Sequence, residues 1–149
     1  MMRSPAEIPE RPDGPASLGR ASVAARILVV DDDSELGEFV AAAATGMGMR
    51  CAVTTNAVDF LAALRPDVTL VLSDLMMPDM DGLELLRHLG EQQCRASIIL
   101  MSGCSWRVLD AAESFARSLD LSVAGKLLKP FRLLELEKLL RAAQEEATR

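Results

Sequence analysis

Acidic, hydroxyl and amino side chains stand directly after the apolar runs of this 149-residue sequence. They are Asp31 and Asp32 after residues 27–30, Asp74 after 68–73, Ser102 after 97–101 and Lys129 after 122–128. Carboxylates held a few ångströms apart repel one another, and a hard divalent cation with oxygen ligands, such as Mg²⁺, neutralises them. A lysine and a hydroxyl in the same pocket would bind an anionic group. Together these residues predict a site for a phosphoryl group, with one aspartate as nucleophile.

The elements that must position these side chains alternate along the chain. Short apolar runs at 27–30, 51–54, 68–73, 97–101 and 122–128 predict strands, most of them buried on both faces. Helical spacing and caps predict helices from Asp33/Ser34 to Gly46/Gly48, from Asn56 to Leu64, from Gly82 to about Gly90, through Val108, Ala112, Phe115 and Leu119 on one face, and from Leu133 through Ala143. This alternation predicts a doubly wound α/β domain with a parallel sheet. Such sheets bind ligands beyond the carboxyl ends of their strands.

Composition narrows the class of protein. The formal net charge of -6 disfavours a broad nucleic-acid footprint, so no nucleic-acid partner is expected. The three cysteines form no metal or disulfide pattern, and no apolar stretch predicts a signal peptide or a membrane span, so we expect a cytoplasmic protein. Residues 1–25 contain four of the seven prolines and predict a flexible leader, with the folded domain over 26–147.

Four motifs carry a family resemblance: "ILVVDDD", "LVLSDLMMPDMDG", "IILMSG" and "LLKPF". Together they resemble the receiver domain of bacterial two-component response regulators, over roughly residues 26–145. The resemblance implies a flavodoxin-like (βα)5 three-layer sandwich with strand order 2-1-3-4-5, as in the stand-alone chemotaxis regulators. It also implies phosphoryl transfer from a sensor histidine kinase or phosphotransfer protein, a Mg²⁺ cofactor, and output through an effector protein in trans or a homodimer. A receiver is not expected to be an enzyme in its own right.

The resemblance assigns a role to each site residue. Asp74 would be the phosphoacceptor, and Asp32, Asp74 and the backbone carbonyl of Met76 would ligate Mg²⁺ directly. Asp31 would reach the metal through water. Ser102 would hydrogen-bond a phosphoryl oxygen, and Lys129 would pair with the phosphate. The Lys129–Pro130 bond is expected to be cis, as in the family.

Other residues in these motifs favour structural roles or depart from the family. Asp33 is expected to cap the first helix with Ser34, and Asp81 and Gly82 to start the third. Lys126 stands where the family usually has an aromatic switch residue, and Trp106 is a candidate for an alternative contact. Neither Met76 nor Cys104, two positions after Asp74 and Ser102, can align an attacking water by acid–base chemistry.

Two rival functions stay open at this point. "VVDDDSE" superficially matches the D-x-D motif of haloacid-dehalogenase-type phosphatases, with Asp31 as nucleophile and Asp33 as acid/base. Against this reading, Glu35 replaces the expected Thr or Val, and the D-L-M-M-P-D-M-D-G block goes unexplained. The second rival is a non-phosphorylated adaptor with the same fold. It has no use for a costly cluster of carboxylates.

Overall fold

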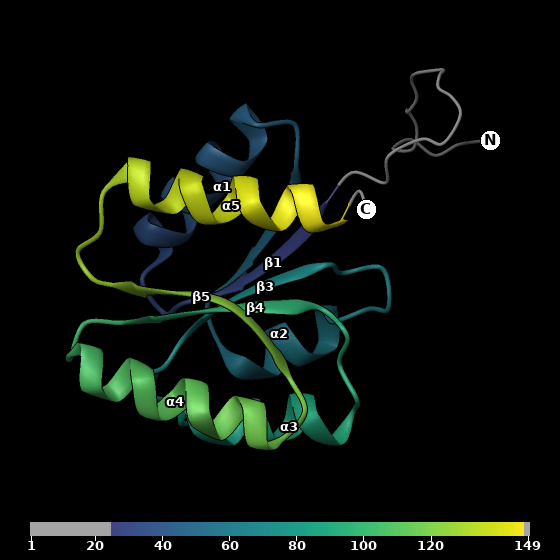
Figure 1. The fold of residues 1–149 in the computed structure, drawn as a ribbon, viewed down its shortest axis with the longest axis vertical. Coiled ribbons are helices and arrows are strands. Elements are labelled where there is room, and N and C mark those ends of the chain that lie inside the picture. The colour runs from purple at the N-terminus through teal and green to yellow at the C-terminus, as the bar shows by residue number, and fades with distance from the viewer. Residues whose placement is uncertain (1–24, 148–149) are drawn as a thin grey trace.

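A computed structural model of the protein describes residues 25–147 (Figure 1). The strands are β1 (Arg26–Val30), β2 (Arg50–Thr54), β3 (Leu70–Asp74), β4 (Ser97–Ser102) and β5 (Ser122–Leu128). The helices are α1 (Ser34–Gly46), α2 (Ala57–Ala63), α3 (Gly82–Glu91), α4 (Trp106–Ser118) and α5 (Leu133–Ala147). Apart from Ala25, which is buried, the predicted leader lies outside the described residues.

The strands form one parallel sheet in the order β2-β1-β3-β4-β5, which confirms the predicted fold class and strand order. Helices α1 and α5 cover one face of the sheet, and α2, α3 and α4 cover the other (Figure 1). Every residue of the central strand β3 is buried, as expected of a strand covered on both faces. Two apolar clusters therefore hold the three layers together, one on each face of the sheet.

Side-chain caps fix where the helices begin. The carboxylate of Asp33 accepts hydrogen bonds from the backbone N–H groups of Glu35 and Leu36, which confirms it as the cap of α1. Asn56 caps α2 and Asp81 caps α3, both as predicted, and Ser105 caps α4. In this topology the helices begin beyond the carboxyl ends of the strands, so the positive ends of their dipoles point toward that edge.

The structure corrects two details of the expected element placement. Val68 lies outside β3, because its N–H completes a turn to the carbonyl of Arg65 and the ladder with β1 starts two residues later. In α4 the residues Leu109, Ala112 and Ala116 are buried, and the predicted Phe115 and Leu119 pack against the same core. Val108 departs from the expectation, because it is 36% exposed. Val108 and Leu109 both fit a helical spacing, so spacing alone does not decide between them.

An irregularity in β5 decides the direction of its side chains. Ile98 pairs with Val123 and Ile99 pairs with Gly125, which leaves Ala124 without a partner in the ladder. Such a bulge reverses the alternation of the residues that follow it. Gly125 then faces α5, where an added Cβ would lie 2.6 Å from Leu139, and the next residue faces α4.

No helix between residues 25 and 147 is both long enough and apolar enough to cross a lipid bilayer.

Gly82 closes the loop that follows β3, and we expect this position to tolerate no Cβ. Its N–H donates to the carbonyl of Leu75 at 3.2 Å, and an added Cβ would lie 2.5 Å from the Leu75 Cα. Because backbone atoms cannot give way cheaply, Gly82→Ala should lower the free energy of unfolding by about 1–3 kcal/mol, measured by urea denaturation. Gly46→Ala is the control, because no atom lies within 4 Å of its added Cβ. Equal stability of the two variants would contradict the prediction.

Candidate functional site

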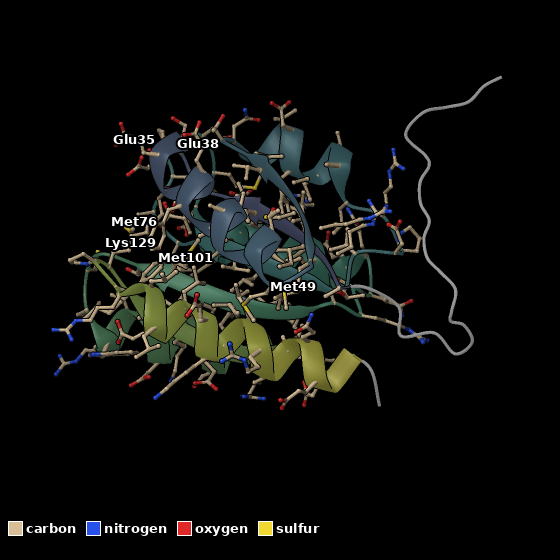
Figure 2. All side chains as sticks on the ribbon, turned by 90° about the horizontal axis from the view of Figure 1, so that it is seen from above. Glu35, Glu38, Met49, Met76, Met101 and Lys129 are labelled. Atoms are coloured by element: carbon tan, nitrogen blue, oxygen red, sulfur yellow. The ribbon has the colours of Figure 1, made fainter. Side chains whose placement is uncertain are left out.

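The carboxyl ends of the strands bring the predicted site residues to one edge of the sheet. Asp31 directly follows β1, and Asp74 and Ser102 are the last residues of β3 and β4. Lys129 directly follows β5, and its N–H donates to the carbonyl of Ser102 at 2.8 Å. Figure 2 shows Lys129 and Met76 at the same end of the molecule, with Met49 at the other end.

Three carboxylates lie close together at this edge. Asp31, Asp32 and Asp74 each offer an oxygen, and these oxygens lie within 4.8 Å of one another. Asp31 and Asp74 are buried, whereas Asp32 is exposed. Backbone N–H groups orient the buried pair: Asp33 donates to Asp31 Oδ1 at 2.9 Å, and Met76 donates to Asp74 Oδ1 at 3.3 Å.

Lys129 supplies the positive charge at the centre of the site. Its Nζ lies 2.6 Å from Asp31 Oδ2 and 3.3 Å from Asp74 Oδ1. Burial by itself would lower the pKa of Lys129, but the hydrogen bond to Asp31 and the charges of both aspartates outweigh burial and raise it. The ammonium is therefore charged at neutral pH and bridges the two buried carboxylates.

The negative charge of Asp74 is only partly balanced by Lys129. Burial, and then the negative charge of Asp31, raise its pKa from 3.8 to about 6, against the opposing effects of Lys129 and the Met76 N–H. Three carboxylates and one ammonium leave a negative site with oxygen donors only. That donor set suits a divalent cation such as Mg²⁺, with Lys129 beside it.

The buried Ser102 hydroxyl is held by a backbone hydrogen bond at this edge of the sheet. Its Oγ accepts this hydrogen bond from the N–H of Cys104 at 3.1 Å. A hydroxyl that accepts such a bond keeps its own hydrogen to donate. The hydroxyl of Ser73, in contrast, donates to the carbonyl of Asp74 at 3.3 Å.

The remaining predicted residues are placed as follows. Met76 follows Asp74 closely and is 57% exposed. The Lys129–Pro130 peptide bond is cis, as predicted. Asp33 and Asp81 direct their carboxylates to the first turns of α1 and α3.

Asp79 is a residue whose contact the sequence did not reveal. Its Oδ2 accepts a hydrogen bond from the N–H of Ala57 at 2.8 Å, which fastens the loop after Asp74 to the start of α2. The two residues are 22 positions apart. A local capping pattern does not reach that far, so only the folded arrangement of β3 and α2 reveals it.

Lys126 binds carboxylates of α4, the helix that begins with Trp106. The Lys126 Nζ lies 2.7 Å from Asp110 Oδ1 and 2.6 Å from Glu113 Oε1, both on α4. These hydrogen bonds, that to Asp110 first, raise the pKa of Lys126. Trp106, in the first turn of α4, is 50% exposed. Lys126 is thus fastened to the second and third turns of α4.

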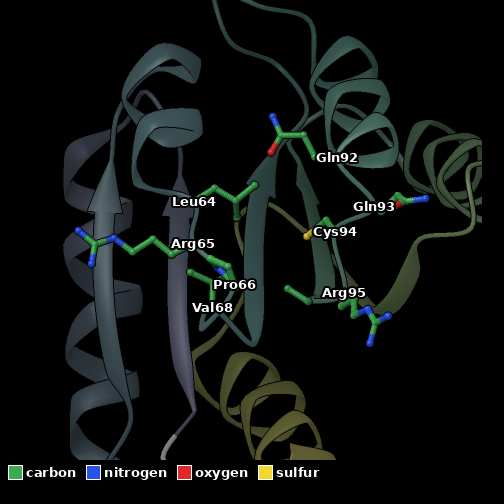
Figure 3. A pocket seen from close by; sticks show the side chains of 9 residues that line it. Leu64, Arg65, Pro66, Val68, Gln92, Gln93, Cys94 and Arg95 are labelled. Atoms are coloured by element: carbon green, nitrogen blue, oxygen red, sulfur yellow. The ribbon is translucent and has the colours of Figure 1, made fainter.

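Two hollows at the opposite, amino end of the sheet share residues 92–95 and have volumes of about 320 and 610 Å³. Figure 3 shows the smaller one, with the guanidinium groups of Arg65 and Arg95 directed away from it. Cys94 is half-buried there, and burial raises the pKa of its thiol, which keeps it protonated and unreactive. These hollows therefore lack a counterpart of the clustered carboxylates and the lysine at the carboxyl end of the described sheet.

Comparison with known proteins identifies a family that matches most of the chain. The family description "Response regulator receiver domain" matches residues 27–141. The chain is 39% identical over 120 residues to the DNA-binding transcriptional regulator NtrC of Proteus hauseri, a match that covers 78% of this chain and 24% of that protein. It is 30% identical over 121 residues to the regulatory protein AtoC of Escherichia coli, covering 79% of this chain and 25% of that protein. The chain thus spans about a quarter of the length of these relatives.

Solved structures share the fold. A response regulator from Colwellia psychrerythraea is 32% identical, with a TM-score of 0.73 over 83% of this chain and 99% of the other. A CheY-like receiver domain from Methanospirillum hungatei is 23% identical, with a TM-score of 0.70 over 84% of this chain and 97% of the other. This chain belongs to the response regulator receiver domain family.

Proposed function

We propose that this receiver domain accepts a phosphoryl group on Asp74, with Mg²⁺, from a sensor histidine kinase or a phosphotransfer protein. The observation that carries the proposal is the pairing of two buried carboxylates, Asp31 and Asp74, around the single ammonium of Lys129. Burying like charges lowers the stability of a fold, so a buried cluster of carboxylates indicates a functional role.

Each residue has a part in the transfer. A carboxylate oxygen of Asp74 attacks phosphorus, the new O–P bond forms, and the P–N bond to the donor's imidazole breaks. Asp32, Asp74 and the Met76 carbonyl would hold Mg²⁺ directly and Asp31 through water, and the cation would neutralise phosphoryl oxygens. The Lys129 ammonium pairs with a further phosphoryl oxygen, and the Ser102 hydroxyl donates to another.

The surface around the pocket favours a protein as phosphodonor. Within residues 25–147, the large apolar side chains that are exposed lie in the first two turns of helices or in the loop after Asp74, which places them at the end of the molecule that holds the site. They are Phe39, Val58, Met76, Leu83, Trp106, Val108, Leu133 and Leu134. Exposed apolar residues gathered at one end are typical of a protein-binding surface.

The output of the domain is proposed to pass to an effector protein in trans, without nucleic acid or membrane binding by the domain itself. The DNA binding in the name of NtrC belongs to a protein about four times as long as the matched segment. The formal net charge of -6 supports a protein partner for this chain. A cytoplasmic location fits this role and its supply of phosphodonors.

Neither rival function gains support from the geometry. In the phosphatase hypothesis Asp33 would act as acid/base, but its carboxylate is exposed and binds the N–H groups of Glu35 and Leu36. The adaptor hypothesis leaves the close approach of Asp31, Asp32 and Asp74 unexplained. We therefore favour a signalling domain that is not itself an enzyme.

Incubation with acetyl phosphate and Mg²⁺ tests the acceptor directly. Intact-mass spectrometry should show an increase of about 80 Da, one phosphoryl group, that is absent in Asp74→Asn. An adduct that persists in Asp74→Asn and disappears in Asp31→Asn would favour the phosphatase. The lack of any adduct in the unaltered protein would favour the adaptor.

The raised pKa of Asp74 predicts that the metal-free protein becomes less stable to unfolding as the pH rises. The folded state holds its proton up to about pH 6, whereas the unfolded state loses it near pH 3.8. Stability from this group is therefore lost as pH rises through that window. At pH 8 the free energy of unfolding, measured by urea denaturation, should be about 1–3 kcal/mol higher for Asp74→Asn than for the unaltered protein. The difference should vanish near pH 3.5, where the Asp74 carboxyl is protonated in both states.

Millimolar Mg²⁺ provides the matched measurement. It should stabilise the unaltered protein at pH 8 and affect Asp74→Asn much less, because a ligand that binds only the folded state raises stability. Equal stabilisation of both proteins would contradict the proposed metal site.

The aspartyl phosphate should not be unusually short-lived. The side chains of Met76 and Cys104 are exposed beside the site, and neither is a base suited to align an attacking water. Timing the loss of the adduct after removal of acetyl phosphate checks this lifetime. Complete loss within seconds would show that another group activates water.

A further inference from the structure

Lys126 joins two elements that lie beside the site, β5 and α4. Its ammonium binds Asp110 and Glu113 of α4. Glu113 also binds Arg117, whose Nη2 lies 2.8 Å from Glu113 Oε2. The side chains of Lys126 and Glu113 are only about a quarter exposed, at 25% and 24%. We refer to Lys126, Asp110, Glu113 and Arg117 as the α4 clamp.

The beginning of α4 is fastened to the phosphoacceptor pocket instead. The N–H of Cys104 donates to the hydroxyl oxygen of Ser102, and Ser105 caps the helix with a hydrogen bond from Val108. Any shift of the Ser102 hydroxyl toward a phosphoryl oxygen on Asp74 therefore pulls on Cys104 and on the first turn of α4.

The strand from which Lys126 extends, β5, is fixed to the sheet. Lys126 pairs in register with Leu100 of β4, and the Lys129 N–H holds the Ser102 carbonyl. The Lys126 ammonium reaches α4 from this fixed strand, so displacement of α4 must stretch its two ion pairs. Because these pairs are partly exposed, their strength is modest and falls with salt.

We propose that Lys126 is a positioning residue that holds α4 against β5 in the unphosphorylated state, so that phosphorylation of Asp74 works against an electrostatic clamp. The inference rests on the proposed phosphorylation of Asp74. An aromatic residue at this place would act through packing, whereas the lysine makes the link between the site and α4 sensitive to ionic strength.

Three variants of the full chain test the clamp. Lys126→Met keeps most of the apolar stem and removes the charge, and Lys126→Arg keeps the charge. Arg26→Met changes the net charge equally but removes an ion pair with Asp67, 3.2 Å long, from the amino end of β1. Deuterium exchange over residues 106–118 and the rate of adduct formation with acetyl phosphate and Mg²⁺ are measured at low and high salt.

At low salt, Lys126→Met should speed both amide exchange in α4 and phosphorylation by about two- to fivefold. High salt should bring the unaltered protein close to that variant, while Lys126→Arg and Arg26→Met should behave like the unaltered protein. A fourth variant, which combines Asp110→Asn with Glu113→Gln, removes the clamp from the α4 side and should reproduce Lys126→Met. Urea unfolding confirms that each variant is folded.

The outcomes separate this inference from the function on which it rests. If the unaltered protein forms an adduct and Lys126→Met forms it at the same rate, the clamp has no influence on phosphorylation and the inference is overturned. Faster exchange in α4 without faster phosphorylation overturns it too, because the lysine is then only structural. If the unaltered protein forms no adduct, the proposed function fails, and the inference fails with it.

Discussion

The candidate site depends on one interaction, the ion-pair bridge from the Lys129 ammonium to the buried carboxylates of Asp31 and Asp74. Asp31 is fully buried and Asp74 nearly so, and the Lys129 ammonium is the positive group in contact with both. Removing charges from water is costly even when they are paired, and here the carboxylates outnumber the ammonium. The fold therefore holds a site that is short of positive charge, and a divalent cation bound there would relieve that shortage.

The strand order makes this bridge possible. Because β1 and β3 are neighbours, with Val30 opposite Ser73, the residues after them emerge side by side as Asp31 and Asp74. Lys129 arrives from two strands away, and its backbone is held by the carbonyl of Ser102 at the end of β4. The neighbouring strands β1, β3 and β4 thus place Asp31, Asp74 and Ser102 at one edge of the sheet. The edge strand β5 adds Lys129 at the same edge.

The sequence predicted what depends on local pattern. Apolar runs that end in charged residues predicted the strands and the gathering of Asp31, Asp74 and Lys129 at one edge of the sheet. Predicted caps at Asp33, Asn56 and Asp81 marked three helix starts. Spacing alone could not choose the buried face of α4, because Leu109, Ala112 and Ala116 fit a helix as well as the set built on Val108. It also could not reveal the contact of Asp79 with α2, nor the bulge at Ala124 that turns Lys126 toward α4. These features depend on which segments meet after folding.

The two lysines of the β5 segment differ in their partners more than in their own exposure. Lys129 and Lys126 are 22% and 25% exposed, but the carboxylates around Lys129 are 0% and 3% exposed, against 64% and 24% around Lys126. Salt screens a pair in proportion to the water around both partners, so the Lys129 bridge resists salt and the Lys126 pairs do not. A rise in ionic strength should therefore weaken the contacts of α4 with Lys126 while the bridge from Lys129 to Asp31 and Asp74 stays intact. Two separate sets of ion pairs, one from Lys126 in β5 and one from Lys129 directly after it, thus hold α4 and the buried carboxylates.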